Sequence, residues 1–238
     1  MRVLAIDTAT NVASAAVVED GKLIGEYTIN NKKKHSQLIM VLIEKLLGDL
    51  SLTVEDIDLF AVANGPGSFT GLRIGVAAMK ALAHSTNKPI IGVSTLEALA
   101  YSVPWCEHII IPIMDARRNS VFTASYIWDE EFHALSEIEA ITIEECVKDC
   151  GELLDVLFIG DGVEVYHDYI KEQLGERAYF PPSALCDIKA SAVAMLALEK
   201  YNRGESDTYL TLKPFYLKKS QAEREYEEKQ KKSAKEGL

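Results

Sequence analysis

Two short stretches of this sequence share one plan, Ile6-Asp7-Thr8-Ala9-Thr10-Asn11 and Met114-Asp115-Ala116-Arg117-Arg118-Asn119. In each, an apolar run ends in an aspartate, and an asparagine four positions later leads into the next apolar run. Because Asp7 and Asp115 are 108 residues apart, the pattern predicts an internal repeat. We therefore expect a chain built from two related lobes.

The residues around these two stretches predict alternating strands and helices. Strands are expected at 3–6, 13–18, 23–29, 57–63, 89–93, 108–114, 121–127 and 156–159. Helices are expected at 36–50, 71–84, 94–101 and 188–201, and a further helix follows residue 162 and ends at about residue 174. This order predicts an α/β protein with an N-terminal lobe at 1–103, a C-terminal lobe at 104–217 and a charged tail at 218–238. The alternating Glu and Lys of the tail indicate a solvated, fraying helix, with a partner-binding segment as the alternative.

The composition excludes several classes of protein. Hydrophobic residues make up 48% of the 238 residues, which is enough to bury a full core. Lys and Arg number 25 against 36 Asp and Glu, so the net charge is −11 and the chain is poorly suited to grip a phosphate backbone alone. The N-terminus has no signal-peptide pattern, and no apolar run is long enough to span a membrane. We expect a cytoplasmic protein that does not enter the membrane.

The four cysteines lack a C-x-x-C pair. Buried reduced thiols are therefore favoured over zinc ligands for Cys106, Cys146, Cys150 and Cys186.

The two aspartates and one glycine-rich loop are the candidates for ligand contact. Asp7 and Asp115 follow buried strands, where an α/β fold places groups that touch ligand, but an Asp in such a turn more often caps backbone amides. The loop Gly65-Pro66-Gly67-Ser68-Phe69-Thr70-Gly71 leads into a helix start, where free amides attract anions. A tight turn without ligand explains it equally well. The candidate nucleotide or phosphate contacts are Asp7, Thr8, Gly65, Gly67, Ser68 and Asp115.

The helices at 36–50 and 71–84 carry more apolar surface than one packed face requires. The apolar residues of the first cover an arc of about 200°, against about 100° for a helix that packs on one side. The second leaves only a narrow polar stripe of Arg73, Lys80 and His84. Either these helices lie in the centre of the domain, or their outer faces bind another subunit, and we favour the second interpretation.

Recognisable catalytic and metal-binding patterns are missing. The five histidines do not pair at a spacing that would hold a metal, and no H-E-x-x-H, G-x-S-x-G or Ser-x-x-Lys arrangement occurs. We therefore expect no catalytic residues, no metal and no cofactor in this chain.

Several segments together resemble one family. They are residues 4–10, the His35-Ser36-Gln37 helix start, residues 65–75, residues 92–100 and Met114-Asp115-Ala116-Arg117-Arg118. The family is TsaB, also called YeaZ, the bacterial subunit needed for threonylcarbamoyladenosine in transfer RNA. The resemblance extends to about residue 218. It implies an actin/Hsp70/sugar-kinase-like fold of two ribonuclease-H-like lobes.

The resemblance also implies a function. Family members are non-catalytic subunits that pair with a larger catalytic paralogue, TsaD, are joined by the ATPase TsaE, and form homodimers alone. The paralogue modifies adenosine 37 of transfer RNAs that read codons beginning with adenine, so this chain would meet transfer RNA only through the complex. The interface would use the two N-terminal helices, and the residues expected there are Leu38, Val41, Leu42, Lys45, Arg73, Val76, Ala77 and Lys80.

The same superfamily suggests two other activities. The paralogue's metal requires two histidines one turn apart, but His35 is followed by Ile39 at that spacing, which makes peptidase activity unlikely. The alternative function is a small-molecule kinase or ATPase that would use Asp7, Asp115 and the glycine-rich loop.

Overall fold

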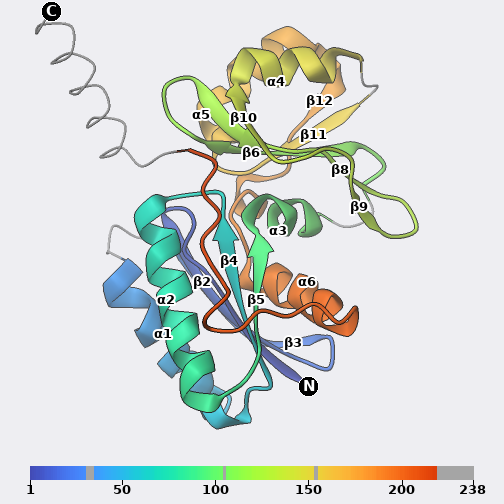
Figure 1. Ribbon diagram of the computed structural model, residues 1–238. Coiled ribbons are helices and arrows are strands. Elements are labelled where there is room, and N and C mark those ends of the chain that lie inside the picture. The colour runs from blue at the N-terminus through green and yellow to red at the C-terminus, as the bar shows by residue number, and fades with distance from the viewer. Residues whose placement is uncertain (31–34, 104–105, 153–154, 219–238) are drawn as a thin grey trace, which may run out of the picture.

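Two sheets with the same strand order form the centres of the two lobes (Figure 1). The computed structural model describes residues 1–30, 35–103, 106–152 and 155–218. The strands of the first sheet are β1 (Arg2–Asp7), β2 (Val12–Glu19), β3 (Lys22–Asn30), β4 (Leu59–Gly65) and β5 (Ile90–Ser94). The strands of the second are β6 (Ile109–Asp115), β7 (Ser120–Thr123), β8 (Tyr126–Trp128), β9 (Phe132–Ala134), β10 (Glu139–Thr142), β11 (Val156–Ile159) and β12 (Ala178–Tyr179).

The strand pairing confirms the repeat seen in the sequence. The first sheet has the order β3-β2-β1-β4-β5, and the second has the corresponding order β10-β7-β6-β11-β12. In the first sheet β1 pairs antiparallel with β2 and parallel with β4, and in the second sheet β6 pairs antiparallel with β7 and parallel with β11. Asp7 ends β1 and Asp115 ends β6, so the two aspartates occupy equivalent places in the two lobes.

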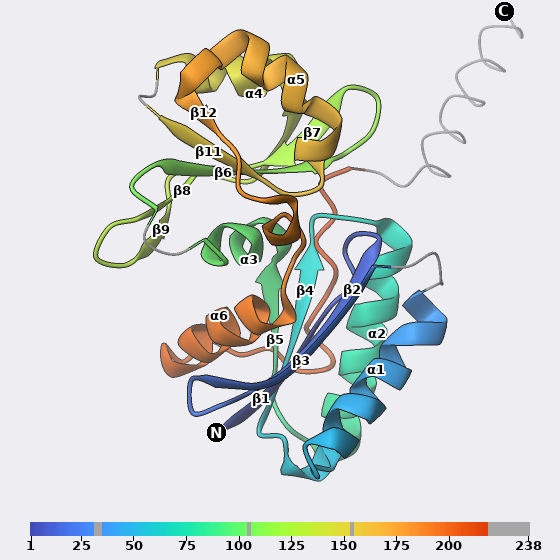
Figure 2. The ribbon, with the colours of Figure 1, turned by 180° about the vertical axis from the view of Figure 1, so that it is seen from behind.

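The helices cover both faces of the first sheet (Figure 2). They are α1 (His35–Asp49), α2 (Phe69–Thr86), α3 (Thr95–Tyr101), α4 (Ile143–Asp149), α5 (Gly162–Leu174) and α6 (Ala190–Asn202). Short 3-10 turns lie at Val54–Asp56, Cys150–Glu152, Gly175–Arg177 and Ser183–Leu185. Helices α1 and α2 lie on one face of the first sheet and α6 on the other, while α3 lies between the lobes.

The alternation of side chains along β1 shows why both faces need a cover. Leu4 and Ile6 pack in one core cluster with Ile39 of α1, whereas Val3 and Ala5 pack in another with residues of α6. All four side chains are fully buried. Burying such a side chain stabilises the fold by about 1.5–3 kcal/mol for Val, Leu or Ile. The strand is therefore apolar along its whole length rather than on alternate residues.

The observed lobes differ from the predicted division at residue 104. Helix α6 packs on β1, β2, β4 and β5, so it belongs to the first lobe although it follows the second lobe in the chain. Its small buried side chains, such as Ala194 and Ala197, allow it to lie close to the sheet. The second lobe therefore consists of the elements from β6 to β12, which are continuous in sequence. The predicted strand at 121–127 is also interrupted, because residues 124–125 separate β7 from β8.

The segment after α6, residues 203–218, returns across the first lobe, and we call it the C-terminal strap. Asp207 pairs with Ile90 of β5, and Leu212 is buried in the same core cluster as α1 and α2. The amide of Phe215 donates to the carbonyl of Asn64 at 2.7 Å. The strap ends between the two lobes, and the predicted helix of the charged tail lies outside the described residues, apart from Lys218.

Among the described residues, no helix has the length and apolarity that crossing a membrane would require.

Candidate functional site

The turn after β1 places Asp7 inside the protein rather than in a cleft. The Asp7 side chain is fully buried, and its Oδ1 accepts a hydrogen bond from the amide of Ala9 at 3.0 Å. Its Oδ2 is buried without a hydrogen-bond partner among the described residues. Burial raises the pKa of Asp7 to about 7, although the amides of Ala9 and Thr8 oppose the shift. Asp7 therefore caps its turn and is held in a site that disfavours its charged form.

The equivalent turn after β6 does open into the cleft between the lobes. Asp115 Oδ1 accepts the Arg117 amide at 2.9 Å, and Oδ2 lies 3.2 Å from the Arg117 guanidinium. The amide of Asp115 donates to Asp161 Oδ1 at 3.1 Å. Burial raises the pKa of Asp161 to about 6, and the charge of Asp115 adds to this shift. Asp115 thus both caps a turn and faces the cleft, so the two interpretations of this residue are not exclusive.

The glycine-rich loop is shaped by close packing against the turn after β1. A Cβ on Gly71 would lie 2.0 Å from the carbonyl oxygen of Thr8, and the Thr8 hydroxyl donates to the Gly71 carbonyl at 2.8 Å. The Ser68 amide donates to the Ala9 carbonyl at 2.7 Å, and Ser68 Oγ accepts the Gly71 amide at 3.3 Å. Two amides at the start of α2 are therefore already bonded within the protein.

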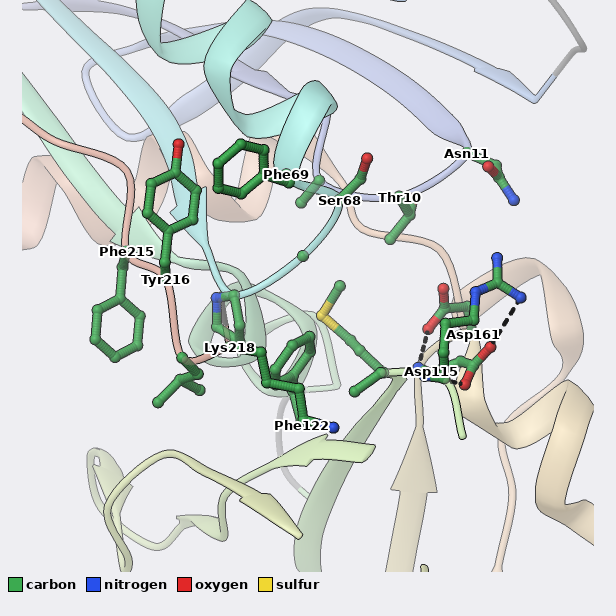
Figure 3. Close-up of a pocket in the computed structure, with 17 residues that line it drawn as sticks. Thr10, Asn11, Ser68, Phe69, Asp115, Phe122, Asp161, Phe215, Tyr216 and Lys218 are labelled. Carbon is green, nitrogen blue, oxygen red and sulfur yellow. Dashed lines mark hydrogen bonds and ion pairs between the residues drawn. The ribbon is translucent and has the colours of Figure 1, made fainter. Parts of the chain in front are cut away.

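The cleft itself is a cavity of about 360 Å³ with a polar and an aromatic end (Figure 3). Asp115 and Asp161 lie at the polar end, and Phe69, Phe122 and Tyr216 lie at the other. The lining residues are Ala9, Thr10, Asn11, Pro66, Gly67, Ser68, Phe69, Met114, Asp115, Ala116, Arg117, Phe122, Asp161, Phe215, Tyr216, Leu217 and Lys218.

The cavity contains half of the ligand contacts predicted from the sequence. Gly67, Ser68 and Asp115 line it. Asp7, Thr8 and Gly65 are buried and do not. For these three the prediction is corrected, because the start of α2 packs directly over the turn that carries Asp7 and Thr8, and the backbone of Phe215 covers Gly65. Asp161 and residues 215–218 also line the cavity and were not predicted from the sequence, although the glycines flanking Asp161 mark a turn at the end of a strand.

The polar stripe of α2 contacts the C-terminal strap. Arg73 Nε donates to the Tyr216 hydroxyl at 3.0 Å. Lys80 Nζ donates to the Leu212 carbonyl at 3.0 Å. The His84 ring lies 4.3 Å from that of Tyr209, measured between centroids. All three side chains of the stripe therefore contact the C-terminal strap of the same chain.

Only part of the predicted interface set is on the surface of α1 and α2. Leu38, Leu42 and Val76 are 8%, 3% and 3% exposed, because they pack inward with the first sheet, so they are corrected to core residues. Val41 is 56% exposed, and Lys45, Arg73 and Ala77 are also exposed. Lys80 is half-buried beneath the strap.

The outward side of the two helices carries apolar groups that no other described part of the chain covers. We define the outer helix face as Met40, Val41, Ala77 and Ala81, all exposed. Beside it lies a groove of about 490 Å³, whose lining includes Met40, Leu47 and Leu82. This is a surface of small and apolar side chains flanked by the charges of Glu44 and Lys45.

The cysteines of the described chain are all unpaired thiols, with Cys146 and Cys150 buried and Cys106 and Cys186 half-buried. Within the same residues, no group of three His, Cys, Asp or Glu side chains is arranged to hold a metal ion.

Comparison with known proteins identifies relatives along most of the chain. Residues 22–226 match the family model described as TsaD, tRNA N6-adenosine threonylcarbamoyltransferase. The tRNA threonylcarbamoyladenosine biosynthesis protein TsaB of Bacillus subtilis is 34% identical, covering 97% of this chain and 100% of the relative. The Escherichia coli protein of the same name is also 34% identical, over 72% of this chain and 76% of its own.

Solved structures agree with the fold. YeaZ from Pseudomonas aeruginosa is 25% identical with a TM-score of 0.76, covering 91% of this chain and 99% of its own. An activator of 2-hydroxyisocaproyl-CoA dehydratase from Clostridium difficile, 12% identical, superposes with a TM-score of 0.53 over 86% of this chain and 97% of its own. The protein has the actin/sugar-kinase-like fold expected from its sequence.

Proposed function

The chain belongs to the TsaB (YeaZ) family, and from this membership we propose that it is a structural and activating subunit in the formation of threonylcarbamoyladenosine in transfer RNA. In this role it docks the catalytic paralogue TsaD, is joined by the ATPase TsaE, and pairs with a second copy of itself when the paralogue is missing. The modified nucleoside is adenosine 37 of transfer RNAs that read codons beginning with adenine.

The outer helix face is the observation that carries the docking proposal. Val41 is 56% exposed and Met40 46%, and neither is covered by another part of the described chain. Burial of such exposed apolar side chains against a partner is favourable because it removes apolar surface from water. The exposed Ala77 and Ala81 have small side chains, which allow a partner helix to approach closely. Lys45 and Arg73 are exposed on the same two helices.

A role without catalysis is supported by the packing function of the turn after β1 and of the glycine-rich loop. Asp7 is buried beside the start of α2, and the glycines of the loop allow close packing against Thr8 and Ala9. The net charge of −11 also fits a subunit that binds protein and reaches transfer RNA through its partners. A kinase or ATPase would instead bind nucleotide in the cleft, so ATP hydrolysis by the purified chain alone would favour that alternative.

The test is a pair of matched substitutions on two helices. Val41→Glu places a carboxylate on the outer helix face, whereas Val165→Glu does so on α5 of the second lobe at nearly the same exposure, 58% against 56%. We expect Val41→Glu to weaken binding to the paralogue by on the order of a hundredfold in Kd, because a desolvated carboxylate at an interface costs about 3 kcal/mol. Val165→Glu should bind normally.

The same two variants separate docking from modification in cells. After depletion of the native protein, Val165→Glu should restore threonylcarbamoyladenosine in bulk transfer RNA and Val41→Glu should not. If both variants bind the paralogue equally and restore the nucleoside equally, the outer helix face is not the docking surface. If depletion leaves the nucleoside unchanged, the proposed function itself is wrong.

A further inference from the structure

Two buried cysteines lie one helical turn apart in the second lobe. Cys146 is in α4, and Cys150 follows its last residue with helical dihedral angles, φ −73° and ψ −14°. The Cys150 amide donates to the Cys146 carbonyl, so the helical turn is complete between them. The two side chains are only 3% and 4% exposed, and both belong to the core cluster of the second lobe. Because residues four apart in a helix lie on the same face, the two thiols are on one side of α4.

A separate cavity of about 240 Å³ lies beside this pair. Both cysteines line it, together with Thr123, Ser125 and Ser136. A water molecule occupies about 30 Å³ in the liquid, and hydrogen peroxide, with two oxygen atoms, needs about twice that volume. The cavity therefore has room for hydrogen peroxide. The docking role proposed above makes no use of this cavity or of its thiols.

The two thiols differ in their readiness to ionise. The neighbouring Cys150 side chain lowers the pKa of Cys146 although burial opposes the shift, and the contact with the Thr123 hydroxyl, 3.9 Å from Cys146 Sγ, also lowers it. The interaction with Cys146 and burial both raise the pKa of Cys150. Cys146 therefore ionises more readily than Cys150, which is the order expected of an attacking and a resolving cysteine.

We propose that Cys146 and Cys150 form a peroxide-reactive dithiol that closes reversibly into an intramolecular disulfide. The Cys146 thiolate attacks one peroxide oxygen, the O–O bond breaks, and the products are a sulfenic acid and hydroxide, which becomes water by taking the proton released by Cys146. The Cys150 sulfur then attacks the sulfenic sulfur, the S–O bond breaks, and the departing oxygen leaves as water with the Cys150 proton. One peroxide is reduced to two waters, and two thiols are oxidised to one disulfide.

The backbone geometry permits this bond with a small adjustment. Residues four apart in a helix have Cα atoms about 6 Å apart, which lies within the range found for disulfides. Their Cβ atoms are about 5–6 Å apart, whereas a disulfide needs about 4 Å, so the end of the helix must tighten. Cys150 stands at that end, and Gly151 after it has open space around its Cα. A bond formed under such tension is readily reduced, which makes the reaction reversible.

The sequence provides a direct test, because trypsin cleaves after Lys148, between the two cysteines. The full-length protein is treated with hydrogen peroxide, alkylated with N-ethylmaleimide and digested without reductant. We expect the peptides 119–148 and 149–171 to stay joined, with two of the four thiols protected from alkylation. Dithiothreitol should separate the peptides and restore both thiols.

Single variants test the order of the reaction, and the two other cysteines provide the control. Cys150→Ser should leave a sulfenic acid on Cys146 that dimedone traps, whereas Cys146→Ser should leave Cys150 alkylatable. Cys106→Ser and Cys186→Ser should form the disulfide as the native chain does. If the native protein treated with peroxide keeps peptides 119–148 and 149–171 separate, or if either joins a peptide containing Cys106 or Cys186, the proposal is wrong. This readout on the native chain does not depend on any variant folding.

Discussion

Replacing Asp7 by Asn should stabilise the protein in a way that depends on pH. The variant keeps the shape of the side chain and an oxygen that can accept the Ala9 amide, but it cannot ionise. What it removes is the need to hold a carboxylate in a fully buried site with one oxygen lacking a partner among the described residues. The substitution therefore isolates the energetic effect of burying this charge.

The magnitude follows from the shift in pKa. Asp7 titrates near 7 in the folded protein against an ordinary value of 3.8. Each pKa unit corresponds to about 1.4 kcal/mol, so the ionised side chain destabilises the fold by about 4 kcal/mol. Between pH 4 and 7 the folded state holds a proton that the unfolded chain has released, so stability falls as the pH rises through this window. Below pH 4 both states are protonated, and above pH 7 both are ionised and the full penalty remains.

Urea unfolding of the native chain and Asp7→Asn at several pH values measures this difference. We expect the free energy of unfolding of the variant, relative to the native chain, to increase by about 1.4 kcal/mol per pH unit between pH 4 and 7 and then to level off. A new amide hydrogen without an acceptor would shift the whole curve by a constant and leave its slope unchanged. Asp149→Asn, an exposed position at the end of α4, controls for the loss of one negative charge. Parallel curves for the native chain and Asp7→Asn would refute the reasoning.

Two further predictions concern packing, and each has its control in the same chain. Gly71→Ala should destabilise the protein by about 3 kcal/mol or more, because the new Cβ would lie 2.0 Å from the Thr8 carbonyl oxygen, whereas Gly48→Ala, where no atom lies within 4 Å, should be neutral or stabilise by about 0.5–1 kcal/mol. Calorimetric Tm values would check this pair, and equal effects would contradict the close approach of α2 to the turn after β1. Leu212→Ala should cost about 2–5 kcal/mol because Leu212 is buried in the core, whereas Leu210→Ala, at 71% exposure, should change the free energy of unfolding by less than about 0.5 kcal/mol. Urea unfolding measures both, and a mild effect at Leu212 would show that the C-terminal strap is not part of the core.

The sequence was sufficient to predict the repeat but not the partners of its elements. Asp7 and Asp115 are at equivalent strand ends, as the pattern indicated, because an aspartate after an apolar run marks a turn that both lobes need. The assignment of α6 to the wrong lobe has a physical reason. A helix rich in alanine fits against any sheet that approaches closely, and its own sequence does not say which sheet that is.

The residues of the two candidate sites were also predicted only in part from the sequence. The wide apolar arc of α1 indicated burial on two sides, but it did not separate the inward Leu42 from the outward Val41, which are neighbours in sequence. The lining of the cleft by residues 215–218 was not visible at all, because it depends on the path of the C-terminal strap across the first lobe. Contacts between distant segments, such as that of Arg73 with Tyr216, leave no periodic pattern.

The discontinuous first lobe has a consequence for synthesis on the ribosome. Strands β1 to β5 emerge early, but the face of their sheet that α6 covers stays open until residues 190–202 have been made. The intervening second lobe needs no later residues to complete its sheet, so it can fold first although it is made second. During this interval the nascent chain exposes the apolar sheet surface that α6 will cover. The emergence of α6, rather than that of the N-terminal half, therefore sets the time at which the first lobe closes.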